Sequence, residues 1–187
     1  MSQVWVFGYG SLVDRSSFGA TIGRELQPGI DFFAAEVSGW GRRWNYGVMH
    51  GAAIGVGRDG NPVAYTRVAL GVVRAAGESV NGVVGRVDED ELARLDLRER
   101  HYDRVDVSDA ASVVGHEPVE GAIVIYVPRR EAIEHYQRAR DNGTAAIEQR
   151  YWDLVDRAFA AFGKDARARY YRTTPTPDVP VLPLRLE

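Results

Sequence analysis

The chain of 187 residues contains no cysteine. This absence excludes disulfides, thiolate metal ligands and a cysteine nucleophile. The four histidines, His50, His101, His116 and His135, are scattered, and no two of them stand at a sequence spacing typical of metal ligands. The sequence therefore predicts no metal site.

Long hydrophobic runs and an excess of positive charge are missing as well. No apolar segment approaches the ~18 residues of a membrane-spanning helix, and the first residues lack the basic and then apolar pattern of a signal peptide. The formal net charge of −3 gives no electrostatic reason to bind nucleic acid. We therefore expect a cytoplasmic protein that binds neither membranes nor nucleic acids.

What is present is an ordinary globular composition, with 45% hydrophobic and 26% charged residues. The length suits one domain, and the chain shows no internal repeats, low-complexity tracts or linkers. Four prolines stand near the C-terminus: Pro175, Pro177, Pro180 and Pro183. The sequence predicts a single domain over residues 1–187, which ends in an extended, proline-containing tail at about 173–187.

A glycine-rich turn follows the first predicted strand. The apolar residues 4–7 favour a buried strand, which stops at Gly8-Tyr9-Gly10-Ser11. Two glycines so close together suit a tight turn, and such a turn leaves backbone N–H groups free to bind a carboxylate or an oxyanion. The turn is either one wall of a small-molecule pocket or only a tight exit from the strand.

The central part of the chain is predicted to be mostly β-structure. Strand patterns occur at residues 33–47, 52–56, 65–75, 79–87, 101–107 and 121–127. We expect the first of these strands to be irregular at Gly39 and Gly41. Residues 65–75 and 79–87 flank Ala76-Gly77-Glu78, which predicts an antiparallel hairpin.

Helical patterns occur at residues 88–99, 130–140 and 144–162. Asp88 is expected to cap the first of these helices, with Glu91 completing a capping box. Because strands fill the centre and helices dominate the C-terminal third, the sequence predicts an α+β fold.

Glu99 does not fit the face of the helix on which it falls. Leu92, Leu95 and Glu99 follow the spacing i, i+3, i+7, which places all three on one face. A carboxylate on an apolar face is costly to desolvate unless it is partnered or lies in a cavity. Such a carboxylate would have a raised pKa, which suits general acid–base chemistry near neutral pH. Alternatively, the helix ends before Glu99, and the side chain reaches solvent or pairs with Arg98, Arg100 or Arg104.

Two segments together resemble the gamma-glutamylcyclotransferase superfamily, which includes the ChaC-like glutathione-degrading enzymes. They are Phe7-Gly8-Tyr9-Gly10-Ser11-Leu12 and Leu95-Asp96-Leu97-Arg98-Glu99, the latter followed by Tyr102. Gly39-Trp40-Gly41-Arg42-Arg43-Trp44 is similar to a stretch of the ChaC-like members, and the strands at 82–87 and 122–127 are also similar to those of the superfamily. The resemblance covers about residues 4–143 and does not extend to 144–187.

The resemblance implies a small mixed β-barrel with flanking helices. It also implies a reaction that needs no cofactor, in which the α-amino group of a gamma-glutamyl compound attacks its own γ-carbonyl. The products are 5-oxoproline and an amine or amino acid. Whether the substrate is a dipeptide, an amine or glutathione stays open, because one sequence does not assign the residues at the mouth of the pocket.

The resemblance also implies roles for individual residues. Glu99 matches the catalytic glutamate, and the residues that match substrate-binding positions are Tyr9, Gly10, Ser11, Leu12, Tyr102 and Tyr126. Tyr136 matches more loosely, and its place on a helix favours a core aromatic.

The sequence argues against two other kinds of site. Ser11 lacks the flanking glycines of a nucleophile elbow, and Val13 stands where a dinucleotide-binding turn has its third glycine. We expect Trp40 and Trp44 to pack in the interior and leave the role of the arginines between them open. The rival to an enzyme is a non-catalytic binding or interaction domain of the same fold.

Overall fold

The structure, a computed structural model, describes residues 3–51, 53–57 and 60–186. Its strands are β1 Val4–Gly8, β2 Phe32–Gly47, β3 Ala53–Val56, β4 Pro62–Val87, β5 Tyr102–Asp106, β6 Ala111–Val113, β7 Ala122–Pro128, β8 Ala145–Glu148, β9 Val181–Leu182 and β10 Arg185–Leu186. Its helices are α1 Arg15–Ile22, α2 Glu89–Arg98, α3 Arg130–Asp141, α4 Gln149–Ala161 and α5 Lys164–Arg172, with short 3₁₀ turns η1 Ser11–Val13 and η2 Ser108–Ala110.

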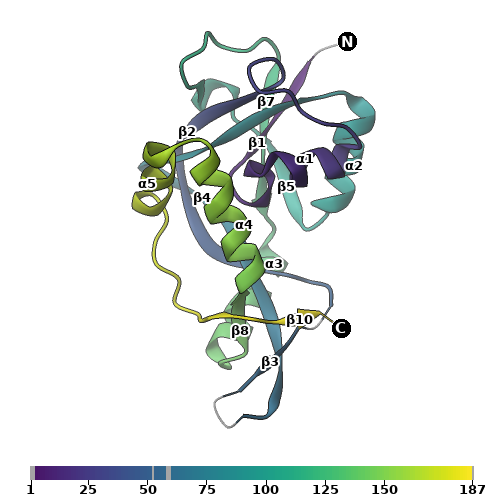
Figure 1. Ribbon diagram of the computed structural model, residues 1–187, viewed down its shortest axis with the longest axis vertical. Coiled ribbons are helices and arrows are strands. Elements are labelled where there is room, and N and C mark those ends of the chain that lie inside the picture. The colour runs from purple at the N-terminus through teal and green to yellow at the C-terminus, as the bar shows by residue number, and fades with distance from the viewer. Residues whose placement is uncertain (1–2, 52, 58–59, 187) are drawn as a thin grey trace.

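The predicted α+β class is confirmed. A curved mixed sheet forms the centre, and the helices surround it (Figure 1). Over the described residues the sheet does not close, since its main path of paired strands runs from β10 at one end to β5 at the other. The sheet is therefore barrel-like rather than a complete barrel. In the same part of the chain, no helix has the length and apolar character needed to cross a membrane.

β1 is the central strand that carries the glycine turn. It pairs antiparallel with β4 and parallel with β7, so it has a neighbour on each side. Its Val6 and Phe7 are fully buried, as expected for an apolar strand covered on both faces. The turn after β1 therefore starts from a rigid part of the core.

The predicted hairpin at residues 65–75 and 79–87 is wrong. Both segments belong to the single long strand β4, and both pair with β2. Gly77 adopts a positive φ of 80°, but it lies in an exposed stretch where the strand bends without reversing. β2 bends beside it, at the register shift around Gly39 that the sequence predicted; the second shift lies at Asn45 rather than at Gly41.

α2 begins as the sequence predicted. The Asp88 carboxylate accepts a hydrogen bond from the Glu91 N–H, and the Glu91 side chain accepts one from the Asp88 N–H, which completes the capping box. Leu95 is fully buried and Leu92 packs against the core. Glu99 is the residue that caps the C-terminal end of the helix.

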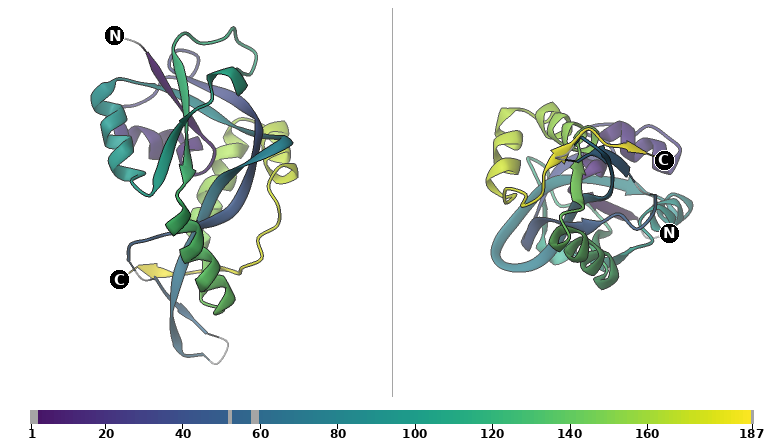
Figure 2. Two further views of the ribbon diagram at one scale, coloured as in Figure 1. Left: turned by 180° about the vertical axis from the view of Figure 1, so that it is seen from behind. Right: turned by 90° about the horizontal axis from the view of Figure 1, so that it is seen from below.

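The C-terminal third departs from the prediction at its second helix. The residues after Thr144 form β8, where Ala145 pairs in parallel with Thr66 of β4, and α4 begins only at Gln149. α5 follows α4, and the tail then crosses the molecule and adds β9 and β10 to the sheet. Seen from both sides, α3 and α4 cover opposite faces of the sheet (Figure 2).

Candidate active site

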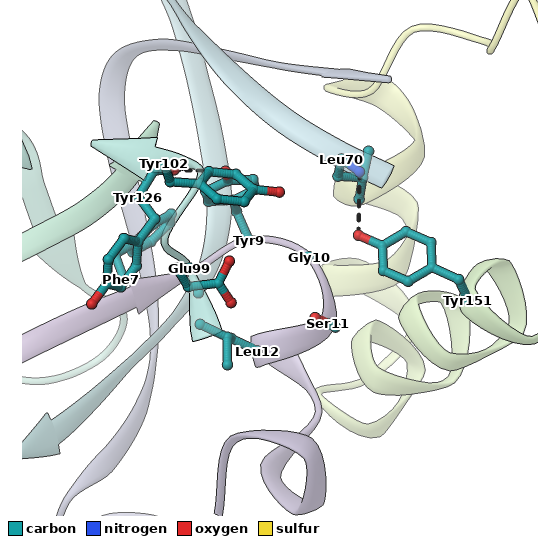
Figure 3. A pocket seen from close by; sticks show the side chains of 11 residues that line it. Phe7, Tyr9, Gly10, Ser11, Leu12, Leu70, Glu99, Tyr102, Tyr126 and Tyr151 are labelled. Carbon is teal, nitrogen blue, oxygen red and sulfur yellow. Dashed lines mark hydrogen bonds between the residues drawn. The ribbon is translucent and has the colours of Figure 1, made fainter. Parts of the chain in front are cut away.

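The glycine turn and the C-terminal end of α2 meet at one pocket (Figure 3). The pocket is open to solvent, and its cavity volume is about 40 Å³. It is lined by Phe7, Gly8, Tyr9, Gly10, Ser11, Leu12, Leu70, Glu99, Tyr102, Tyr126 and Tyr151. All the site residues that the sequence pointed to, from Tyr9 to Tyr126, are thus brought together.

The two glycines of the turn permit close packing. A Cβ on Gly8 would lie 2.8 Å from the Cβ of Leu12, and a Cβ on Gly10 would lie 2.9 Å from the hydroxyl of Tyr151. Neither glycine has a positive φ. The turn therefore needs glycine because neighbouring groups approach the backbone and not because of a left-handed conformation.

The turn presents backbone donors to the pocket. It continues into η1, which begins with a hydrogen bond from the N–H of Val13 to the carbonyl of Gly10. The N–H groups of Ser11 and Leu12 stand at the start of this helical turn, where no intrahelical acceptor exists. Such groups are suited to bind an anion.

Glu99 lies in the pocket and also has a cationic neighbour. Its side chain is 14% exposed, and its Oε1 lies 3.1 Å from the Nε of Arg98. Burial raises the pKa of the Glu99 carboxyl, and Arg98 lowers it by a smaller amount. In Figure 3 the carboxylate faces the turn between Tyr9 and Ser11. Both alternatives from the sequence therefore apply in part: the carboxylate is sheltered in a cavity and is paired with a neighbouring arginine.

Arg98 connects Glu99 to the turn. One of its terminal nitrogens donates to the Oγ of Ser11 at 2.9 Å, and the other donates to the Oγ1 of Thr21 at 2.5 Å. The end of α2, the turn and α1 are thereby held in one network. The Ser11 hydroxyl is engaged in this network, and no catalytic base is found beside it among the hydrogen bonds of the described residues.

The two predicted tyrosines contribute in different ways. The ring of Tyr102 stacks on Tyr46 with centroids 4.4 Å apart, and no hydrogen bond to the Tyr102 hydroxyl is found within the described part of the chain. The Tyr126 hydroxyl donates to Asp96 at 2.7 Å, and its backbone carbonyl accepts from the Tyr9 hydroxyl at 2.7 Å. The hydroxyl of Tyr126 is therefore already hydrogen-bonded, and only its ring lines the pocket. The Tyr102 hydroxyl is available to bind a substrate.

Two lining residues from outside the glycine-turn segment 7–12, Leu70 and Tyr151, were not predicted. Tyr151 comes from α4, and its hydroxyl accepts a hydrogen bond of 3.2 Å from the backbone N–H of Leu70 in β4. The helical spacing of Tyr151 identified it only as a core residue, because its place in the pocket depends on how α4 crosses the turn. Tyr136 lies in the core as expected, where its hydroxyl donates to Asp178 at 2.6 Å.

The remaining polar candidates lie elsewhere. Trp40 and Trp44 are buried, as predicted, and Arg43 pairs with Glu78 at the surface. His50 and His101 approach each other, with their Nε2 atoms 2.7 Å apart. Within the described residues, no group of three or more histidine or carboxylate side chains is placed to hold a metal ion.

Comparisons with known proteins place the chain in a family. The sequence profile described as Gamma-glutamyl cyclotransferase, AIG2-like, matches residues 43–154. A comparison with curated proteins found no match.

Several solved structures have a similar fold. A structure titled Gamma-glutamyl cyclotransferase is 15% identical with a TM-score of 0.55, and the alignment covers 95% of this chain and 93% of that one. A yeast gamma-glutamyl cyclotransferase described as specific to glutathione is 14% identical with a TM-score of 0.54, over 92% and 96% of the two chains. YkqA from Bacillus subtilis is 17% identical with a TM-score of 0.56, over 92% of this chain but only 54% of that protein.

At these identities the structures establish the fold alone, whereas the profile match covers more than half of the chain. The resemblance to the superfamily is thereby confirmed, and the ChaC-like subtype stays a prediction. The chain belongs to the gamma-glutamyl cyclotransferase, AIG2-like family.

Proposed function

We propose that the protein catalyses cyclotransfer within a gamma-glutamyl compound, which releases 5-oxoproline and an amine or amino acid. The observation that carries the proposal is the position of Glu99. Its carboxylate is sheltered, has a raised pKa, and lies in the same pocket as a turn with free backbone donors. Perturbed carboxylates of this kind cluster at functional sites.

Glu99 would act first as a base and then as an acid. The substrate's α-ammonium group loses a proton to the Glu99 carboxylate, and its nitrogen then attacks the γ-carbonyl carbon. After the attack, this nitrogen carries one proton more than the lactam product. When the tetrahedral intermediate collapses, the original amide bond breaks and Glu99 returns its proton to the departing nitrogen. The extra proton passes from the ring nitrogen to the amine product, which leaves as an ammonium ion. No oxidant, reductant or water is consumed, so the reaction balances within the substrate and one carboxyl group.

The turn would hold the negative groups. Backbone N–H groups between Tyr9 and Leu12 are suited to bind the substrate's carboxylate or the oxyanion of the intermediate. The Tyr102 hydroxyl is free to donate to the same groups, and the Tyr126 ring forms a wall. Holding the substrate curled, with its amine against its carbonyl, supplies the effect of proximity.

The test is to incubate the protein with gamma-glutamyl dipeptides, gamma-glutamyl amines and glutathione and to quantify 5-oxoproline. We expect at least one class to be turned over and the Glu99→Gln variant to be inactive. The class that reacts also identifies the leaving group and tests the ChaC-like prediction. Absence of turnover of every class, or full activity of Glu99→Gln, would contradict the proposal.

The second candidate is a binding domain of the same fold without turnover. It is favoured by the ion pair between Arg98 and Glu99, because a carboxylate held by a cation is a weaker base. Calorimetry with 5-oxoproline separates the two functions. Binding by the wild-type protein without turnover of any gamma-glutamyl compound would identify the binding domain.

A further inference from the structure

Arg42 is a fully buried cation behind the pocket. It lies in the middle of β2 and has no solvent-exposed surface. Its guanidinium carbon lies 5.0 Å from the ring centroids of both Phe159 in α4 and Tyr170 in α5, two rings that stack on each other with centroids 4.5 Å apart. Cation–π contacts of this kind stabilise a desolvated arginine.

No carboxylate pairs with Arg42 among the described residues; its hydrogen-bond partners are neutral. Its Nε donates to the Tyr9 carbonyl at 3.0 Å, one terminal nitrogen donates to Thr174 Oγ1 at 3.0 Å, and the other donates to the Asn81 carbonyl. Burial lowers its pKa to about 10, so the group is still charged at neutral pH. A buried charge without a counter-charge is costly.

The bond to Tyr9 fixes a peptide of the glycine turn. The described residues contain no cis peptide bonds, so the carbonyl of Tyr9 and the N–H of Gly10 point in opposite directions. The carbonyl points into the core, toward Arg42. The Gly10 N–H therefore leaves the peptide on the other side. Gly10 lines the pocket and has no side chain of its own to fix its backbone, and the Arg42 bond holds the carbonyl of this peptide.

We propose that Arg42 is a positioning residue, which holds the Tyr9–Gly10 peptide so that the Gly10 N–H faces the pocket and which favours a negative group bound there. A cation that donates to a carbonyl polarises the peptide and strengthens its N–H as a donor. A carboxylate or oxyanion at the turn would then supply the counter-charge that the core lacks. The bond from Arg42 to the Tyr9 carbonyl is present in the structure, whereas the catalytic consequence rests on the proposed function.

Residues of the C-terminal part of the chain contact Arg42 and so belong to the surroundings of the site. Tyr170 and Thr174 lie beyond residues 43–154, which the family profile matches. Both contact the guanidinium group, and Tyr151 of α4 lines the pocket directly. The C-terminal helices are thus expected to complete the turn and not merely to cover the sheet.

The first test is structural and needs no substrate. Crystal structures of Arg42→Met and Thr174→Val compare loss of the whole group with loss of one remote bond. Without Arg42, the Tyr9 carbonyl is left buried and unpaired, which is unfavourable. We therefore expect the peptide to rotate in Arg42→Met and to keep its orientation in Thr174→Val. An unchanged peptide in Arg42→Met would overturn the proposal.

Arg42→Lys covers the case in which Arg42→Met does not fold. Lysine keeps the charge but lacks the planar fork that reaches Tyr9, Thr174 and Asn81 together. We expect the peptide to be displaced or to adopt two orientations in this variant. A peptide held as in the wild type by lysine would show that the arginine does not position it.

The second test is kinetic. We expect Arg42→Met to lower kcat by about 100-fold, the scale of losing one oxyanion donor, with a smaller change in KM. Thr174→Val should change kcat by less than about threefold, even if both variants melt at lower temperature. Losses of kcat that merely follow stability would overturn the positioning role. If the wild-type protein turns over no gamma-glutamyl compound, the proposed function fails, and the crystal structures still decide the role of Arg42.

Discussion

The two ends of α2 carry glutamates in contrasting environments. At the first end, Glu91 is 6% exposed and lies 2.5 Å from Arg24, with its other oxygen accepting from the N–H of Asp88 at 3.0 Å. At the last end, Glu99 lies in the pocket, and the only donor found near it within the described residues is Arg98 at 3.1 Å. The same residue type on the same helix therefore accepts hydrogen bonds on both oxygens at one end, whereas at the other end one oxygen forms an ion pair.

The helix itself widens this difference. Its N-terminal end carries partial positive charge and stabilises the Glu91 carboxylate, whereas its C-terminal end carries partial negative charge and opposes a carboxylate at Glu99. Burial adds to the effect and raises the pKa of Glu99. The comparison teaches that a buried carboxylate with few donors is available for proton transfer, while one with a full set of partners serves the fold.

The largest effect is expected at Glu99. Changing Glu99 to Gln keeps the size of the side chain but removes its ability to exchange a proton, so 5-oxoproline release should fall by about 10²–10⁴-fold. Steady-state assays at a fixed pH measure this directly. If Glu99→Gln keeps more than a tenth of the wild-type rate, Glu99 is not the group that transfers the proton.

The stability of the same variant provides a control with a defined sign. Because the pKa of Glu99 is raised in the folded protein, the folded state binds more protons than the unfolded state above the unfolded pKa of about 4.3. The wild-type protein should therefore lose stability as the pH rises from about 4.3 through the folded pKa. Urea unfolding at both ends of this range should show Glu99→Gln gaining stability relative to wild type at the higher pH.

The opposite pattern is expected at Glu91. Changing Glu91 to Gln removes the charge opposite Arg24 and weakens the capping box, which should lower the free energy of unfolding by about 1–2 kcal/mol. The kcat of the folded protein should stay within about threefold of wild type. Urea unfolding and activity assays on one preparation measure both quantities. A large loss of kcat without a loss of stability would mean that the two ends of the helix do not differ as described.

The two ends of α2 were predicted from the sequence because their signals are local. Asp88 and Glu91 form a short capping pattern, and the spacing of Leu92, Leu95 and Glu99 places the carboxylate on the apolar face. That Glu99 faces the glycine turn was predicted only through resemblance to a family. No periodicity connects two segments that lie about ninety residues apart.

The parts that were not predicted depend on long-range pairing. A glycine such as Gly77 suits either a hairpin turn or a bend within one strand. Because the segments on both sides of it pair with β2, the chain bends and does not reverse. The sequence of Ala145 to Glu148 fits a helical pattern, but these residues form β8 because they pair with β4. Tyr151 reaches the pocket only because α4 packs over the turn. In each case a tertiary contact outweighs the local preference.

A smaller effect is expected when Arg98, the cation paired with Glu99, is removed. Changing Arg98 to Met should raise the pKa of Glu99, because Arg98 lowers it in the wild-type protein. The carboxylate must be deprotonated to act as a base, so the acid limb of the profile of kcat/KM against pH should move to higher pH by about one unit. Arg98 also contacts Ser11, so only the position of the limb, and not its height, tests the prediction. If the acid limb does not move, Arg98 does not control the pKa of the catalytic carboxylate.

The smallest effects are expected at the two tyrosines, and they separate pocket from scaffold in the same way. Tyr102→Phe removes a hydroxyl without a partner in the described residues, so kcat/KM should fall by about tenfold, the scale of one lost hydrogen bond to the substrate, with little change in stability. Tyr126→Phe removes a hydroxyl that donates to Asp96, a residue of α2. Because this bond joins β7 to the helix, the free energy of unfolding should fall by about 1 kcal/mol, while kcat/KM falls only about threefold. Kinetics and urea unfolding on both variants measure the contrast. If both variants lose the same activity, the Tyr126 hydroxyl contributes to substrate binding as much as the Tyr102 hydroxyl does, although it is bonded to Asp96.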